Sequence, residues 1–171
     1  MRLILTDRAL RVAVPDDGKT AYVDLTTRKI ARCVGCFGCW TRTPGRCVIR
    51  DDATRIYPLI ARSDTLLYVS RIRYGGYDTV MKTMLERAIP VQQAFIRVVD
   101  GETHHEQRAV VPKRATIVAY GAETPDELEL FRQLVARNAR NMNFTEHRVL
   151  FVRENEVDDT VKQLIATWER S

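Results

Sequence analysis

Short apolar runs alternate along this chain with longer segments in which apolar residues recur at helical spacing. Buried strands are predicted at the runs, which are Arg2–Thr6, Asp64–Ser70, Arg114–Tyr120 and His147–Val152. Helices are predicted where apolar residues recur every three or four positions, in Ala53–Arg62, Asp78–Ala88, Pro125–Met142 and Asp158–Trp168. From Asp51 onward this alternation predicts right-handed crossovers, and therefore a three-layer α/β/α fold with a mainly parallel sheet.

Residue types at the helix starts agree with this assignment. Capping side chains are expected at Asp51-Asp52, Asp78 and Thr124, the last of them followed by proline at the favoured first helical position. The helix that begins at Asp78 is expected to bury one face, formed by Val80, Met84 and Leu85. No repeat, linker or low-complexity tract interrupts the pattern, so we expect residues 1–171 to form one domain.

Two segments have a weaker pattern. Leu10–Val14 and Thr20–Leu25 flank the turn signal Pro15-Asp-Asp-Gly18, which predicts either a hairpin or two strands of one sheet. Phe95–Val99 and Ala109–Val111 are expected to pair across the turn region at Asp100-Gly101. Ligands of parallel sheets bind where strand carboxyl ends meet loops, so Ser70–Tyr77 and Gly121–Thr124 are the candidate binding loops.

Composition places the chain among ordinary globular proteins. It has 171 residues, of which 45% are hydrophobic and 29% charged, and no apolar run approaches the length of a membrane helix. Met1–Asp7 lacks the features of a secretory signal, so a cytoplasmic location is expected. The net charge of +5 comes from scattered arginines. Solvated surface charge explains this better than nucleic-acid binding, and attraction of an anionic nucleotide is a third explanation.

All four cysteines lie within residues 33–47, in the pattern Cys33-x2-Cys36-x2-Cys39-x7-Cys47. Clustered cysteines in a cytosolic chain indicate metal or redox chemistry rather than structural disulfides. Gly35 and Gly38 give the loop the freedom to turn several sulfurs inward. Three interpretations remain open: an iron–sulfur cluster, a zinc site, or reduced thiols that bind no metal.

The residues around this loop resemble a known group of proteins. The stretch Ala31 to Asp52, with its final Asp51-Asp52, is similar to the cysteine loop of the NAD(P)H-dependent FMN reductase and iron–sulfur flavoprotein group. The similarity continues through Ala53–Arg62 and the segment Tyr74–Arg87, which contains Lys82 and the pair Glu86-Arg87. It implies a flavodoxin-like fold, FMN as cofactor and a 4Fe–4S cluster on Cys33, Cys36, Cys39 and Cys47.

The resemblance also implies which residues contact the flavin ring. They are Ser70, Arg71, Arg73, Tyr74, Gly75 and Gly76, together with Gly121 and Ala122 from a second loop. The implied function is that of a flavin-dependent oxidoreductase or electron-transfer flavoprotein. Its partner is expected to be a nicotinamide nucleotide or a redox protein, and its assembly a homodimer.

The chain departs from that group at its beginning. The first strand is followed by Asp7, Arg8 and Ala9 instead of a Gly- and Ser-rich phosphate loop. Too few residues separate it from Tyr22 for a full first helix, so a shortened N-terminal unit is expected. The phosphate is then expected on arginines such as Arg8, Arg71 or Arg73; the alternative is a redox-sensing or binding module that has lost FMN.

Other polar and aromatic residues have ordinary structural explanations. His104-His105, between Glu102 and Glu106, is more consistent with a polar hairpin tip or a dimer contact than with a metal site. His147 is expected to be structural. Trp40 is expected either to shield a cofactor or anchor a partner, or simply to pack the cysteine loop.

Overall fold

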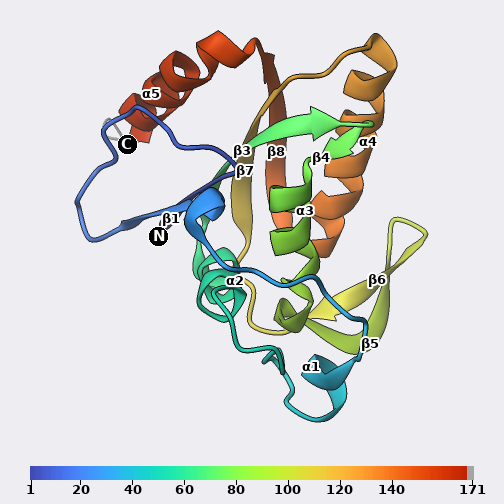
Figure 1. Ribbon diagram of the computed structural model, residues 1–171. Helices are drawn as coiled ribbons and strands as arrows, with labels where there is room; N and C mark the ends of the chain where they lie inside the picture. Colours follow the sequence, from blue (N-terminus) through green and yellow to red (C-terminus); the bar gives the residue numbers. More distant parts are fainter. Residues whose placement is uncertain (169–171) are drawn as a thin grey trace.

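The computed structural model describes residues 1–168 and consists of a mainly parallel sheet between two helical layers (Figure 1). The strands are β1 (Arg2–Thr6), β2 (Thr20–Asp24), β3 (Thr65–Arg73), β7 (Lys113–Tyr120) and β8 (Phe144–Val152), in the spatial order β2-β1-β3-β7-β8. Neighbours along this path are parallel, with Leu3 opposite both Ala21 and Leu66. This arrangement is the predicted α/β/α fold.

Alternate residues of each central strand enter two separate cores. In β1, Leu3 and Leu5 belong to one core while Ile4 belongs to the other. The first core lies under α2 (Ala53–Arg62), α3 (Thr79–Glu86) and α4 (Pro125–Asn141), and the second lies under α5 (Val157–Trp168). Because both faces are covered, the strands are continuous apolar runs rather than alternating ones.

The N-terminal unit is shortened, as predicted. Strands β1 and β2 are parallel neighbours, which rules out the hairpin alternative, and the segment between them contains neither a helix nor the strand suggested at Leu10–Val14. Leu10, Val12 and Val14 pack on the second core beside α5. An extended segment therefore covers the part of the sheet that a first helix would cover.

The helices begin and end close to the predicted positions, with two corrections. Thr124 caps α4 by accepting a hydrogen bond from the Glu127 N–H, as expected. In α3 the buried side chains are Met81 and Met84, whereas Val80, predicted to be buried, is 37% exposed. The Asp52 side chain does not cap α2, because its carboxylate accepts a hydrogen bond from the Lys29 N–H instead.

Two hairpins correct the interpretation of the irregular segments. The predicted loop after β3 is a continuation of the strand to Arg73, followed by a turn and a short strand β4 (Gly76–Tyr77) that pairs back on β3. Strand β5 (Gln92–Val99) pairs with β6 (Glu102–Gln107), so the predicted pairing with Ala109–Val111 is wrong. The turn at Asp100-Gly101 is where it was expected, with a positive φ at both residues.

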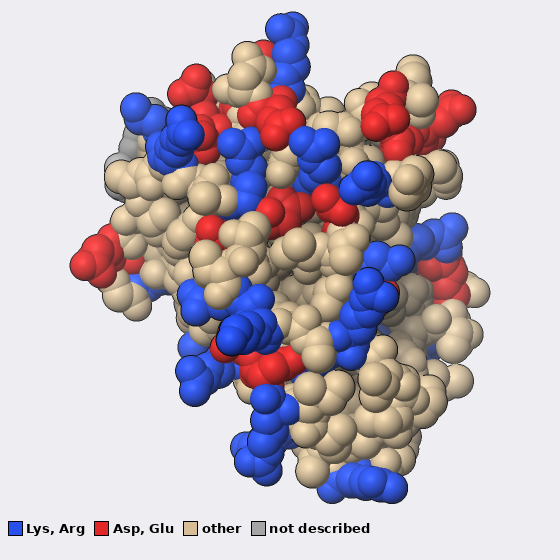
Figure 2. Space-filling model, in the orientation of Figure 1, with Lys and Arg blue, Asp and Glu red and all other residues tan. Residues whose placement is uncertain are grey.

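Short elements complete the chain, namely the 3-10 turns η1 (Leu25–Thr27), η2 (Ile89–Val91) and η3 (Glu154–Glu156) and the single-turn helix α1 (Gly38–Thr41). In the part of the chain that the structure describes, no helix has the length and apolar character needed to cross a membrane. Lys and Arg are interspersed with Asp and Glu over much of the face in Figure 2, while its lower right, over α1 and β5, is largely uncharged.

Candidate functional site

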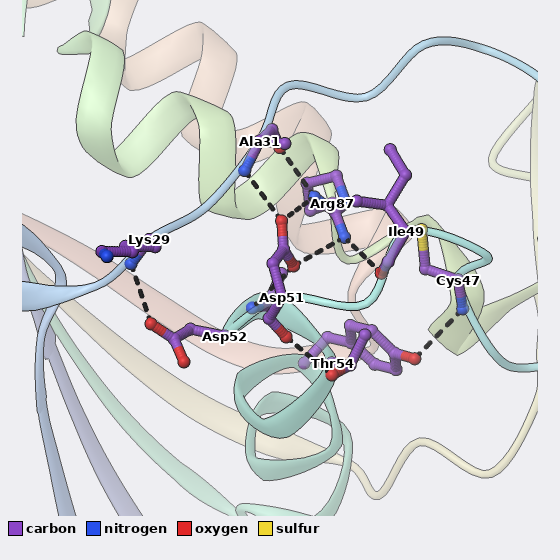
Figure 3. Close-up of polar contacts among 10 residues, drawn as sticks. Lys29, Ala31, Cys47, Ile49, Asp51, Asp52, Thr54 and Arg87 are labelled. Atoms are coloured by element: carbon purple, nitrogen blue, oxygen red, sulfur yellow. Dashed lines mark hydrogen bonds and ion pairs between the residues drawn. The ribbon is translucent and has the colours of Figure 1, made fainter.

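The neck of the cysteine loop is held by one buried ion pair. Arg87, at the end of α3, is 1% exposed and forms a two-pronged contact with the Asp51 carboxylate at 2.7 and 2.9 Å. The same guanidinium donates to the backbone carbonyls of Ala31 and Ile49, on the two sides of the loop (Figure 3). Arg87 therefore joins the beginning and the end of the loop to α3.

Asp51 completes this neck. Its carboxylate also accepts hydrogen bonds from the N–H groups of Ala31 and Ala53. Burial acts to raise the pKa of Asp51, but these hydrogen bonds and the charge of Arg87 hold it below its ordinary value. The carboxylate is therefore stabilised in its ionised form. The sequence identified Asp51-Asp52 as helix caps, whereas their main contacts are with the loop.

The loop carries four thiols that differ in exposure. Cys33 and Cys36 are exposed, and Cys39 and Cys47 are partly buried. Burial raises the pKa of the Cys39 thiol. Left-handed backbone at Gly35 and Phe37 turns the chain between these cysteines.

The loop also packs against the β5–β6 hairpin. The Trp40 indole N–H donates to the Gln92 carbonyl at 3.1 Å, and its ring lies 4.6 Å from that of His105. The Tyr57 hydroxyl of α2 accepts a hydrogen bond from the Cys47 N–H (Figure 3). Trp40 thus packs the loop onto the rest of the protein, which is one of the roles expected for it.

The cysteines do not form a closed site for a metal ion. Among residues 1–168, no three His, Cys, Asp or Glu side chains converge closely enough to hold one metal ion. The Nε of Arg87 is buried without a hydrogen-bond partner in the described residues. A hydrogen-bond acceptor would be favoured on that side of the guanidinium.

A second polar cluster lies at the carboxyl edge of the sheet, where β1, β3 and β7 end. One Asp7 carboxylate oxygen accepts hydrogen bonds from the Ser70 hydroxyl at 2.7 Å and the Arg71 N–H at 2.9 Å. The other accepts from the Tyr120 hydroxyl at 3.1 Å. Burial raises the pKa of Asp7, while these hydrogen bonds act in the opposite direction. Asp7 therefore occupies the crevice between β1 and β3, where the strand order changes direction.

Two arginines cover this cluster. The guanidinium groups of Arg8 and Arg71 each lie 5.5 Å from the centre of the Tyr120 ring. Both approach Glu154, with Arg71 at 2.7 Å and Arg8 at 4.0 Å from its carboxylate. Two of the expected phosphate-binding cations thus meet here, and both already have a carboxylate neighbour.

The predicted flavin-contacting residues divide between two places. Ser70, Arg71, Gly121 and Ala122 gather at the carboxyl edge, where Gly121 has a φ of +77° and lies against the Arg71 side chain. Beside them is a cavity of about 680 Å³ that Gly121 and Ala122 line. It lies at the carboxyl ends of β7 and β8, where the fold class predicts ligands.

Arg73, Tyr74, Gly75 and Gly76 form the tip of the β3–β4 hairpin. Tyr74 and Gly75 have φ of 52° and 70°, as a two-residue hairpin turn requires. Glycine is required at position 75 for a second reason, besides its positive φ: a Cβ there would lie 2.8 Å from a carbon of Leu130. Arg73, Tyr74 and Gly76 face a separate cavity of about 720 Å³ between α3 and α4.

Some site features were not identified from the sequence. Tyr120 and Glu154 lie in unremarkable stretches, and only the fold brings them to Asp7. The sequence does contain one feature that could have identified Asp7 as a site residue, namely a charged residue directly after a buried strand. His104 lies within β6 rather than at a hairpin tip; it is 7% exposed and its ring contacts Asn141 and Glu102.

Comparison with known proteins gives this arrangement a context. No protein-family model matches the chain. An iron–sulfur flavoprotein of Archaeoglobus fulgidus is 30% identical over 86 residues, which is 50% of this chain and 38% of that protein. An iron–sulfur flavoprotein of Methanocaldococcus jannaschii is 25% identical over 92 residues, covering 54% and 47% respectively. The chain is related in sequence to the iron–sulfur flavoproteins. The predicted family resemblance is therefore confirmed, although each match spans less than half of the relative.

The fold comparison points the same way. The structure of an FMN-dependent NADH-azoreductase from Bacillus anthracis, solved with FMN, aligns with a TM-score of 0.58 at 8% identity. The alignment covers 98% of this chain and 96% of that one. The flavodoxin-like fold predicted for this relative of the iron–sulfur flavoproteins is thereby confirmed.

Proposed function

We propose that this protein is a flavin-dependent oxidoreductase or electron-transfer flavoprotein whose second redox centre is a 4Fe–4S cluster on Cys33, Cys36, Cys39 and Cys47. The observation that carries the proposal is the presence of four free cysteines on one loop, whose neck Arg87 and Asp51 hold. The names of its sequence relatives support both cofactors, and that of the azoreductase supports FMN.

The chain's own residues would prepare the cluster site in two ways. Arg87 fixes both sides of the loop, through its hydrogen bonds to the carbonyls of Ala31 and Ile49. The Tyr57 hydroxyl and Trp40 hold the loop against α2 and β5, so the cysteine backbone is ordered before any cofactor enters. When bound, a flavin exchanges electrons in pairs or singly and a cluster exchanges them one at a time.

The flavin ring is proposed to lie at the carboxyl edge, in the cavity that Gly121 and Ala122 line, with Ser70 and Arg71 beside it. The hairpin residues Arg73, Tyr74 and Gly76, which the resemblance also assigned to the ring, line the other cavity. A glycine at position 121 lets a backbone N–H approach a ring carbonyl. Arg8 and Arg71 are the nearest cations for a phosphate, which would have to replace Glu154 as their partner.

Cofactor content is the direct test of the proposed function. After anaerobic purification we expect about four irons with equal sulfide per chain, a broad absorption near 400 nm, and flavin absorption at about 450 nm after addition of FMN. Cys39→Ser should lower the iron content at least about fivefold, since it removes one of the four proposed thiolate ligands. Val34→Ser is the matched control: it adds a hydroxyl to the same exposed loop, keeps every thiol and should retain the iron.

Two results would contradict parts of this proposal. Stoichiometric zinc in place of iron would exclude the cluster. Protein that holds iron but takes up neither FMN nor riboflavin would favour a second candidate, a flavin-free redox-sensing or binding module. One observation supports this candidate, namely that Asp7 and its hydrogen-bond donors fill the crevice between β1 and β3.

The partners are part of the proposal. A nicotinamide nucleotide or a redox protein would exchange electrons with the flavin, and a reducing compartment such as the cytoplasm would keep the cysteines as thiols. We propose a homodimer that covers the uncharged surface around Phe37 and the exposed apolar residues of β5, which are Phe95, Ile96 and Val98 at 71, 66 and 75% exposure. Val98→Lys should convert the dimer to a monomer in light scattering, whereas Val80→Lys, on α3, should leave it intact.

A further inference from the structure

A cavity of about 720 Å³ lies between α3 and α4 and is lined in part by residues of the β3–β4 hairpin. Figure 1 shows these two helices side by side in front of the sheet. Its volume is within the range of small-molecule sites. The walls are mainly apolar, formed by Leu85, Ala88, Ile89, Leu134, Met142 and Phe144.

Two phenol groups line this cavity, and that of Tyr68 has no hydrogen-bond partner in the described part of the chain. The Tyr68 hydroxyl is buried and has no partner within residues 1–168, and Tyr68 as a whole is 2% exposed. Tyr77, the second phenol, is 8% exposed. Burial raises the pKa of both groups far above the ordinary value, so both stay neutral donors. Buried hydroxyls without partners are uncommon and need an explanation.

The rim of the cavity carries charges of both signs. Arg73 and Lys82 are opposed by Asp78 and Glu86. Lys82 and Glu86 approach each other to 4.0 Å. Because the charges balance, the rim offers no net attraction to an anion or a cation.

We propose that this cavity binds a neutral, flat aromatic molecule whose carbonyl oxygen accepts hydrogen bonds from the phenols of Tyr77 and Tyr68. The apolar walls would cover the rings, and the oxygen would satisfy the two donors, Tyr77 first because it is the more exposed. The site uses neither the cysteines nor the carboxyl-edge cavity, so it does not depend on the proposed redox function.

Coumarin, a neutral aromatic lactone, is the probe, and naphthalene is its counterpart without oxygen. Amide NMR shifts should map coumarin binding to α3, α4 and the β3–β4 hairpin. Tyr77→Phe should weaken coumarin roughly threefold or more, the loss expected for one hydrogen bond, and leave naphthalene binding unchanged. Leu134→Trp should fill the cavity and abolish the binding of both coumarin and naphthalene. Gln133→Trp, on the exposed face of α4, should leave the binding of both probes unchanged.

The proposal is overturned by three results. The first is the absence of shifts at millimolar coumarin. The second is shifts that persist in a Leu134→Trp protein whose amide spectrum shows it to be folded; if that variant fails to fold, Asn138→Trp, on the partly exposed rim of α4, takes its place. The third is an equal loss of coumarin and naphthalene affinity in Tyr77→Phe, which would assign the phenol a packing role only.

Discussion

Two carboxylates, Asp51 at the neck of the cysteine loop and Asp7 at the carboxyl edge of the sheet, are held by opposite means. Asp51 faces the guanidinium of Arg87, whereas Asp7 accepts hydrogen bonds from neutral donors only. Their pKa values move in opposite directions as a result, downward for Asp51 and upward for Asp7. Hydrogen bonds from neutral groups satisfy a carboxylate geometrically without compensating its lost hydration.

The two regions consequently differ in what they leave available for a ligand. At the neck, the polar groups are used to hold the loop and the four thiols stay on its surface or partly covered. At the edge, the polar groups are hydrogen-bonded to one another, and Tyr120 and Glu154 line the cavity together with the glycine-containing loop.

The largest expected effect is at the neck. Arg87→Met should lower the free energy of unfolding by about 3–5 kcal/mol, because it leaves Asp51 buried without its cation. The matched substitution Lys82→Met, on an exposed i,i+4 pair of the same helix, should cost less than about 0.5 kcal/mol. Urea denaturation measures both. Equal costs for the two variants would show that Arg87 contributes little more than a surface charge.

The pH dependence of stability should separate the two carboxylates. Asp7 has a raised folded pKa, so its contribution is fully present below the unfolded value near 3.8 and is lost as pH rises through the folded pKa. Asp51 has a lowered folded pKa, so its contribution is present above the unfolded value of 3.8 and is lost as pH falls through the folded pKa. Asp7→Asn should abolish only the first of these losses.

At pH 7, Asp7→Asn should change the free energy of unfolding by no more than about 1 kcal/mol, since an amide can keep most of the same hydrogen bonds. Thermal unfolding from pH 3 to pH 8 is the measurement. If the variant keeps the wild-type loss of stability above pH 4, another group is responsible for it and the contrast between the two sites fails.

The smallest expected effect tests the arginines at the edge and rests on the proposed flavin. Glu154→Gln removes the carboxylate that Arg71 and Arg8 now face, so FMN should bind roughly threefold more tightly while riboflavin, which has no phosphate, is unchanged. Glu156→Gln, in the same turn, is the control and should affect neither. An equal gain for both flavins would place the phosphate elsewhere.

Much of the fold could be predicted because its elements are marked by local patterns. The bounds of β1 and α2 were predicted to the residue, since an apolar run or a helical repeat coincides with each. Strand β6 was missed because Glu102–Gln107 is polar throughout and pairs only with β5 at the periphery. Val80 was wrongly predicted to be buried, because the α3 side chains that face the core are Met81 and Met84.

Only the part of the candidate site that is formed by residues close together in the sequence could be predicted. The cysteine loop is such a case, because four ligand-type residues lie within one stretch. The Asp7 cluster joins residues separated by 63 and 113 positions, so no spacing could indicate that Ser70 and Tyr120 would meet at one carboxylate. The flavin-contacting residues remain a prediction that the experiments above address.

The position of β1 also has a consequence for synthesis on the ribosome. This strand lies between β2 and β3, and Arg2 is opposite Thr65. One edge of β1 therefore stays unpaired until β3 has left the exit tunnel. The free edge of β3 likewise stays unpaired until β7 has emerged, because Thr65 of β3 is opposite Arg114 of β7. Nascent chains that end before β8, the strand that covers the other edge of β7, should expose an apolar strand edge and be clients for chaperones, whereas chains that include β8 should not.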